Sequence, residues 1–273
     1  MEPFAPGRCA RGPANVGGAL GPTAGHAGRR DRPVPRDPHG LPARMPVTPA
    51  ARFARDGYFV PPATLPPDLL GPLRARFREP AGGRRGGVRH LLDGEPLVRD
   101  LAADPAVWGV AAGVSRDDVV AVRATLFDKT PAANWAVPRH RDDRVAVAGR
   151  VDDPAWQDWK RAGGVWTARP PRAFLRRVAA VRVHLDPCGE DDGPLVVAPW
   201  SHRDDNTARP PATLTTPAGG LIVMSPAVLH GSGKALAPDR RRVIHIEYAP
   251  PTPPGGARWR HAVGRAIDRT NAA

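Results

Sequence analysis

Short β-branched segments, separated by glycine and proline, fill the second half of the chain and constrain its fold more than any other feature. Period-2 alternation and β-branched residues predict strands over residues 119–127, 178–185, 195–197, 221–224 and 241–248. Turn-forming pairs, Gly193-Pro194 and Gly219-Gly220, lie between these segments. Strands of this kind are typical of an antiparallel sandwich or barrel.

Helical periodicity comes before the strands. Thr48 to Asp56 predicts a short capped helix, and Pro66 to Glu79 carries leucines at helical spacing. Pro105 to Val114 predicts another helix, and residues 57–60 a short strand. The expected class is therefore α+β, mainly β, with N-terminal helices packed on an antiparallel core.

The chain divides into three parts by composition. Residues 1–45 contain 16 Gly or Pro and no apolar periodicity, so we expect a disordered tail. Residues 46–255 form the expected folded domain, and residues 256–273 a C-terminal extension. Inside the domain, residues 143–177 connect two strand regions and carry Trp156, Trp159 and Trp166. This connection is either a lid or binding loop, or a surface insertion with its own tryptophan cluster.

Charge and cysteine content indicate which binding partners and which cellular compartment to expect. The net charge is +13, but arginine supplies 37 of the 40 basic residues and is spread along the chain, so no nucleic-acid partner is expected. Two cysteines make no disulfide framework. The sequence has neither a run of about 18 apolar residues nor an N-terminal apolar h-region, so we expect no membrane span and no signal peptide. A cytoplasmic location fits best.

His140 and Asp142 form the first half of a candidate metal site. On an extended strand, residues i and i+2 point the same way. One imidazole and one carboxylate can then reach the same ion, and a second imidazole from a distant strand would complete the facial triad of non-heme Fe(II) oxygenases.

A segment about 90 residues later in the sequence could supply the second imidazole of the candidate metal site. His230 follows an apolar strand and precedes small residues, so it can face a cavity. Eleven residues later, Arg241 opens a strand whose alternation places it on one face with Val243, His245 and Glu247. An arginine inside a barrel is costly unless a carboxylate pairs with it. A 2-oxoacid with a distal carboxylate would supply that partner, whereas a solvated surface arginine is the alternative.

Together these residues resemble the phytanoyl-CoA dioxygenase family of Fe(II)/2-oxoglutarate-dependent oxygenases. The resemblance runs from about Thr48 to Pro250 and rests on the order and spacing of four elements. They are Asp56-Gly57-Tyr58, His140-Arg141-Asp142, the stretch Gly189 to Leu195 with Pro199-Trp200-Ser201-His202, and His230 followed by Arg241. The resemblance implies a double-stranded β-helix, the jelly-roll or cupin-like core.

The resemblance also implies roles. His140, Asp142 and His230 would bind Fe(II), and Arg241 would bind the distal carboxylate of 2-oxoglutarate. Further candidates for the cosubstrate are Ser232 and Arg89, and candidates for the pocket wall are Lys129, Trp135, His184 and His245. With O₂, such an enzyme would hydroxylate a small organic substrate and release succinate and CO₂. The carboxylate of Asp142 favours hydroxylation over halogenation, because a halogenating relative would need a small residue there.

The chain departs from the family pattern at Arg139, Arg141, Asp192 and Trp200. The arginine pair indicates either an anionic substrate or two solvent-facing side chains. Two other functions stay open at this point: a cupin-type metal enzyme that does not use 2-oxoglutarate, and a degenerate, non-enzymatic basic binding protein. The substrate and the oligomeric state are not readable from the sequence.

Overall fold

The computed structural model describes residues 48–81, 86–115, 118–203, 209–236 and 239–265. All of them belong to one unit, Val47–Ala273. The tail expected over residues 1–45 lies outside the described residues, and its disorder stays a prediction. No described helix has the length and apolar character that a membrane span requires.

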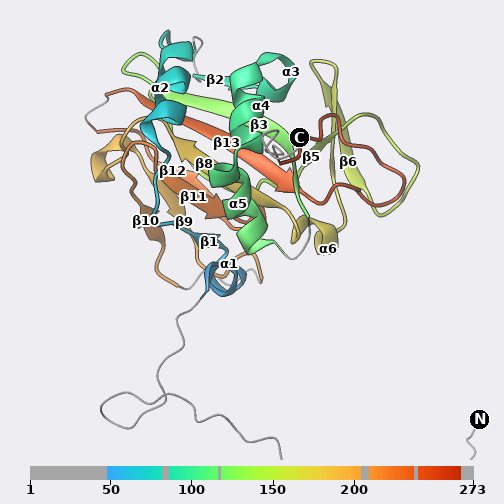
Figure 1. The fold of residues 1–273 in the computed structure, drawn as a ribbon. Coiled ribbons are helices and arrows are strands. Elements are labelled where there is room, and N and C mark those ends of the chain that lie inside the picture. Colours follow the sequence, from blue (N-terminus) through green and yellow to red (C-terminus); the bar gives the residue numbers. More distant parts are fainter. Residues whose placement is uncertain (1–47, 82–85, 116–117, 204–208, 237–238, 266–273) are drawn as a thin grey trace, which may run out of the picture. The chain divides into compact units, whose positions relative to one another are not determined.

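Two antiparallel sheets form the jelly-roll core (Figure 1). The six-stranded sheet has the order β1 (Tyr58–Phe59), β11 (Leu221–Met224), β8 (Ala179–His184), β13 (Arg241–Ala249), β3 (Val120–Lys129) and β2 (Gly87–Arg89). The four-stranded sheet has the order β10 (Ala212–Leu214), β9 (Leu195–Val197), β12 (His230–Ser232) and β4 (Val137–His140). Leu195 and Val197 of the smaller sheet pack with Ile222 and Met224 of the larger one.

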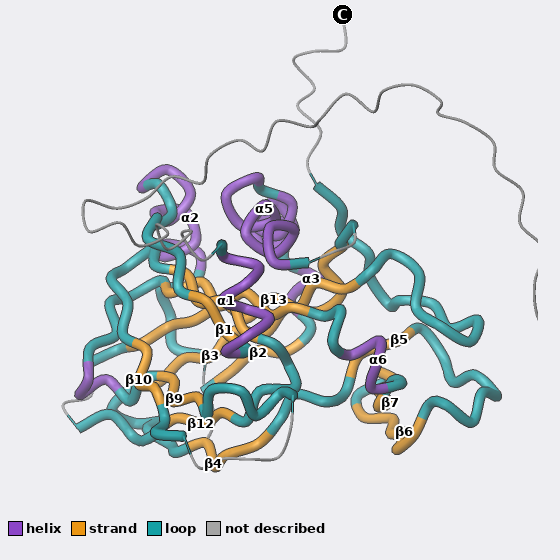
Figure 2. Tube along the Cα trace, turned by 90° about the horizontal axis from the view of Figure 1, so that it is seen from below, coloured by secondary structure: helices purple, strands orange, loops and turns teal. Residues whose placement is uncertain are grey.

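Helices cover the outer face of the six-stranded sheet (Figure 2). They are α1 (Pro49–Asp56), α2 (Pro67–Arg76), α3 (Leu91–Gly94), α4 (Pro96–Ala103) and α5 (Pro105–Val114). Four of the five begin at a proline, whose fixed φ and missing N–H suit a first helical turn. Thr48 and Asp104 cap α1 and α5 through their side-chain oxygens. The expected α+β arrangement with helices on the sheet is confirmed.

One predicted helix ends early. Residues 66–79 were expected to be helical, but α2 stops at Arg76. Arg240 and Arg242 donate hydrogen bonds to the carbonyl oxygen of Phe77 at 2.9 and 3.0 Å, and Arg240 also reaches that of Glu79 at 2.8 Å. These guanidinium groups satisfy carbonyls at the helix end, a distant contact that helical periodicity does not reveal.

The connection over residues 143–177 has secondary structure of its own. It contains β5 (Val145–Val147), β6 (Gln157–Ala162), β7 (Val165–Arg169) and the short helix α6 (Arg172–Leu175). The three strands make a separate sheet in the order β5-β7-β6. Trp156 stacks on Trp159 at 5.7 Å between ring centroids, and Trp159 meets Trp166 edge-on at 6.2 Å. The structure therefore gives this segment the tryptophan cluster of the surface-insertion alternative.

Part of the expected C-terminal extension packs on this domain. Trp259 is 8% exposed and contacts Phe174 with ring centroids 5.9 Å apart. Val263 forms an antiparallel bridge with Ala121 of β3. Residues 256–265 thus add to the buried core beside the three-stranded sheet.

Side chains on β13 alternate as the sequence predicts. Ile244, Ile246 and Tyr248 pack into the helix-covered core. Arg241 and His245 belong to the opposite set and are buried between the sheets, although both are polar. The inner face of the larger sheet is thus unusually polar, and that polarity surrounds the candidate site.

Candidate metal centre

Strand pairing brings the two predicted histidine ligands together. β12 pairs with β4 in a register that sets His230 opposite His140. Side chains of such cross-strand partners lie on the same face. The two imidazole ring centroids are 4.4 Å apart, so the rings are neighbours although the residues are far apart in sequence.

Asp142 completes the cluster from just beyond β4. The sequence places it on an extended strand with His140, but β4 ends at His140. The amide of Asp142 instead donates to the carbonyl oxygen of Pro226 at 2.8 Å, which ties the segment to the loop before β12. One ligand atom from each of His140, Asp142 and His230 lies within 4.8 Å of the others.

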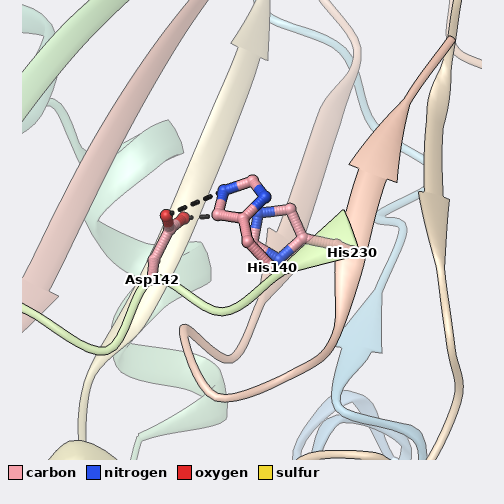
Figure 3. Close-up of side chains that lie close together, drawn as sticks. All are labelled: His140, Asp142 and His230. Carbon is pink, nitrogen blue, oxygen red and sulfur yellow. Dashed lines mark ion pairs between the residues drawn. The ribbon is translucent and has the colours of Figure 1, made fainter. Parts of the chain in front are cut away.

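Both imidazoles present the same nitrogen to the carboxylate (Figure 3). Nε2 of His140 is 3.3 Å from one carboxylate oxygen of Asp142, and Nε2 of His230 is 3.4 Å from the other. The Nδ1 atoms lie 2.9 Å from the carbonyl oxygens of Pro138 and Val228, each two residues earlier. Nδ1–H donation to those carbonyls orients both rings with Nε2 toward the carboxylate, which is the arrangement of metal-binding histidines.

The electrostatics keep Asp142 ionised. Burial alone would raise its pKa, but hydrogen bonds from His140 and His230 outweigh burial and hold the pKa of Asp142 well below its ordinary value. His230 is 4% exposed, whereas the side chain of His140 is 41% exposed. The cluster therefore has one buried wall and one open side.

A cavity of about 80 Å³ joins the cluster to Arg241. Its wall contains all three clustered residues together with Ser232, Arg241 and the predicted pocket residue Trp135. Phe127, Val137, Arg182, Leu195 and Gly231 complete the lining. Residues from both sheets thus enclose one small space.

Arg241 lies at the start of β13, opposite Lys129 of β3. It is 3% exposed and donates to the carbonyl oxygen of Gly193 at 2.9 Å, while its buried Nε has no hydrogen-bond partner among the described residues. Lys129 donates to the hydroxyl of Ser232 at 3.2 Å and lies 5.7 Å from the centroid of the Trp135 ring. Burial and the neighbouring Arg241 lower the pKa of Lys129 to about 8.

Four predicted residues lie outside the cavity wall: Lys129, which adjoins it, and Arg89, His184 and His245. Arg89 is exposed on the edge strand β2, so the structure does not bring it to this cavity. His184 is fully buried on β8 with both ring nitrogens unpaired in the described part of the chain. His245 lies behind the cluster, with Nε2 3.8 Å from carboxylate oxygens of both Asp142 and Glu247.

Arg182 is the residue that sequence reasoning missed. It lines the cavity from β8 and is 6% exposed. One of its guanidinium nitrogens lies 3.3 Å from Nδ1 of His245. Alternation along the strand places Arg182 on the same face as His184, but nothing in the sequence shows which face meets the metal cluster.

The two arginines flanking the His-x-Asp element differ. Arg141 donates to the carbonyl oxygens of Ala227 at 2.9 Å and Ser201 at 3.0 Å, so it holds together two loops near the site. It also lines a second, larger cavity of about 510 Å³ and is absent from the wall of the cavity at the metal cluster. Arg139 is exposed. Trp200, where the family has glycine, adopts the left-handed φ of 73° that favours glycine.

Comparison with solved structures shows the same fold. The epimerase SnoN, in complex with Fe3+, alpha ketoglutarate and nogalamycin RO, is 18% identical, with a TM-score of 0.58 over 82% of this chain and 90% of that chain. AviO1 from Streptomyces viridochromogenes Tue57 is 26% identical, with a TM-score of 0.54 over 77% and 98%. HygX from Streptomyces hygroscopicus, with nickel and 2-oxoglutarate bound, is 14% identical, with a TM-score of 0.53 over 72% and 84%.

No curated protein matches the chain. The sequence pattern of the family described as phytanoyl-CoA dioxygenase matches residues 53–243, which include the His–Asp–His cluster and Arg241. This match spans well over half of the 273 residues. The chain is therefore a member of the phytanoyl-CoA dioxygenase family.

Proposed function

We propose that the chain is a non-heme Fe(II)- and 2-oxoglutarate-dependent dioxygenase that hydroxylates a small organic substrate and releases succinate and CO₂. One observation carries the proposal: a single cavity contains both the His–Asp–His cluster and Arg241. Membership of the family supports it, as do the ligands named for SnoN and HygX.

The donor set fits iron. Two neutral imidazoles and one ionised carboxylate on one side of an ion are the facial triad of non-heme Fe(II) oxygenases. Metal–ligand bonds of about 2.1 Å place neighbouring ligand atoms about 3 Å apart. The separations of 3.3 and 3.4 Å between the imidazole nitrogens and the carboxylate oxygens are close to that spacing. His140, Asp142 and His230 would therefore hold the ion with little rearrangement.

The far end of the cavity fits a carboxylate. Arg241 is buried, its Nε is unpaired, and no carboxylate of the described residues lies within salt-bridge distance of it. A buried guanidinium without a counter-ion is costly, and a bidentate carboxylate removes that cost. Ser232 and Lys129 lie beside Arg241 and add a hydroxyl and a second cation.

Each residue would then have one task. Bound iron would supply the oxidative decarboxylation of 2-oxoglutarate and oxygen transfer to a substrate C–H bond. His140 and His230 are oriented by the carbonyls of Pro138 and Val228. Asp142 occupies the position that a halide would need, which favours hydroxylation. Phe127, Trp135 and Leu195 line the cavity and exclude water from it.

Succinate formation tests this function. The protein is supplied with Fe(II), ascorbate, O₂ and 2-oxoglutarate, and succinate is measured by chromatography. We expect slow succinate release without substrate, none in His230→Ala, and a KM for 2-oxoglutarate raised about 10- to 100-fold in Arg241→Gln, because a charge-assisted hydrogen bond is lost. Arg161→Gln, an exposed arginine on β6, is the matched control. Iron binding without any succinate would instead favour the cupin-type enzyme.

A further inference from the structure

The cavity contains more positive charge than its single acid balances. Its charged wall residues are Asp142, Arg182 and Arg241, and Lys129 adjoins it. In the proposed function Asp142 is committed to the metal ion, which adds two further positive charges. One guanidinium suffices for the distal carboxylate of 2-oxoglutarate, so Arg182 has no assigned counter-ion.

Arg182 lacks a close counter-ion in the described part of the chain. Among the described residues, no carboxylate lies within 4.0 Å of its guanidinium group, and its buried Nε has no hydrogen-bond partner. The groups that contact its guanidinium are neutral: Nδ1 of His245 at 3.3 Å and the ring of Phe127 at 5.6 Å. By contrast, Arg123 of β3 lies opposite Glu247 of β13 and forms an ion pair with its buried carboxylate. Like Arg241, Arg182 is therefore an inward arginine without a carboxylate partner among the described residues, and an anion from outside the protein can pair with it.

The register of the larger sheet places Arg182 at the metal end of the cavity. Arg182 lies opposite His245, and Nε2 of His245 is 3.8 Å from Asp142. Arg241 lies four residues from His245 along β13. At about 3.4 Å per residue, this puts their backbones about 14 Å apart. The two arginines therefore extend into the cavity from backbone positions about four residues apart along the sheet.

The size of the cavity limits what can lie between them. When volume is counted as the space open to the centre of a water-sized sphere, one water needs about 10–15 Å³. The cavity of about 80 Å³ therefore has room for about six waters. This suits one molecule with ten non-hydrogen atoms, the size of 2-oxoglutarate, while the open side at His140 leaves a route for a substrate. Arg182 lines the enclosed space, so we assign its anion to the cosubstrate.

We infer that Arg182 binds the C1 carboxylate of 2-oxoglutarate, so that the cosubstrate is held between two arginines, Arg182 at the metal end and Arg241 at the distal end. This inference rests on the proposed function and deepens it. It makes Arg182 a specificity-determining residue, because each carboxylate of the diacid then pairs with an arginine of the protein. The preference for a diacid over a monoacid should therefore persist when the metal is absent.

Two truncated ligands test the inference in metal-free protein by calorimetry. 4-Oxopentanoate has a methyl group where 2-oxoglutarate has its C1 carboxylate, and 2-oxopentanoate has one in place of the distal carboxylate. We expect wild-type protein to bind 2-oxoglutarate about 10- to 100-fold more tightly than either, the effect of losing one charge-assisted contact. In Arg182→Gln the preference over 4-oxopentanoate should disappear, while the preference over 2-oxopentanoate remains. Arg241→Gln should show the opposite pattern, and Arg161→Gln no change.

The outcomes separate the inference from the function it rests on. If Arg182→Gln retains the preference over 4-oxopentanoate, or if wild-type protein binds 2-oxoglutarate only with iron, the two-arginine arrangement is wrong. If 2-oxoglutarate fails to bind with and without iron, the proposed function fails as well. Thermal unfolding supplies the second readout. Arg182→Met should unfold at no lower temperature than wild type without ligand, because an unpaired buried charge is removed, and should lose most of the shift that 2-oxoglutarate causes.

Discussion

At the scale of single residues, the proposed site contains buried charges without a carboxylate partner among the described residues. Arg123 is paired with Glu247, and Arg242 with Asp186 at 2.7 Å. Arg182 and Arg241 are as deeply buried and have no carboxylate partner among the described residues. Because buried charges are normally paired, the unpaired ones support the anion site proposed for 2-oxoglutarate.

Lys129 makes this anion site sensitive to pH. Its pKa is lowered to about 8, so ligand-free protein loses this positive charge as the pH rises through 8. A bound dianion favours the protonated form and raises the pKa. We therefore expect the affinity for 2-oxoglutarate to fall above pH 8, with proton uptake on binding, measured by calorimetry in buffers of different ionisation enthalpy. Lys129→Met should bind more weakly at pH 7 and show no such fall; an unchanged pH profile in this variant would contradict the assignment.

Residue spacing predicts part of this site and misses the rest. His140, Asp142 and His230 are brought together as predicted, because the His-x-Asp spacing is local and the remaining imidazole lies at a strand edge. Arg89 is not brought to the cavity, because β2 is an exposed edge strand. Arg182 was missed because its contact with His245 depends on the pairing of β8 with β13. The sequence does not show such a register directly.

At the scale of elements, the hydroxyl of Tyr248 links β13 to the helical layer. Tyr248 is fully buried, and it donates a hydrogen bond to the carbonyl oxygen of Ala102 in α4 at 2.9 Å. We expect Tyr248→Phe to lower the free energy of unfolding by about 1–2 kcal/mol, because a buried carbonyl loses its partner, as measured by urea denaturation. Tyr58→Phe is the control, since the hydroxyl of Tyr58 makes no hydrogen bond to the described residues. Equal effects of the two changes would show that the link to α4 is unimportant.

Elements with strong local signals were predicted, and those fixed by distant contacts were not. The helix over residues 105–114 agrees with α5 to the residue, because a capping aspartate and a proline mark its start. The strands at 195–197 and 221–224 also agree. By contrast, α3, α4 and β4 were not predicted as elements. β4 is three-quarters exposed residues and owes its strand geometry to pairing with β12.

At the scale of the whole molecule, the side chains of the proposed site come from both sheets. His140 and His230 belong to the four-stranded sheet, and Arg182 and Arg241 to the six-stranded one. A metal ion with 2-oxoglutarate would therefore connect both layers of the jelly roll. A ligand that binds only the folded state stabilises it by RT ln(1 + L/Kd) at a free ligand concentration L, which is about 2.7 kcal/mol at a concentration of 100 times Kd.

This connection predicts cooperative stabilisation. We expect Fe(II) and 2-oxoglutarate together, under anaerobic conditions, to raise the melting temperature by more than the sum of their separate effects, and a chelator to remove most of the gain. Differential scanning calorimetry measures both. In Arg241→Gln the iron effect should remain and the additional effect of 2-oxoglutarate should shrink. Purely additive shifts in wild-type protein would mean that the two ligands do not share one site.

The most direct test of the central claim is an anaerobic titration of metal-free protein with Fe(II) and then 2-oxoglutarate, followed by visible absorption. If one cavity holds the metal and the cosubstrate, a metal-to-ligand charge-transfer band appears only after both are added. The band should be absent in His140→Ala and should need about 10- to 100-fold more 2-oxoglutarate in Arg241→Gln. Folded, iron-loaded wild-type protein that shows no band at saturating 2-oxoglutarate would contradict the account.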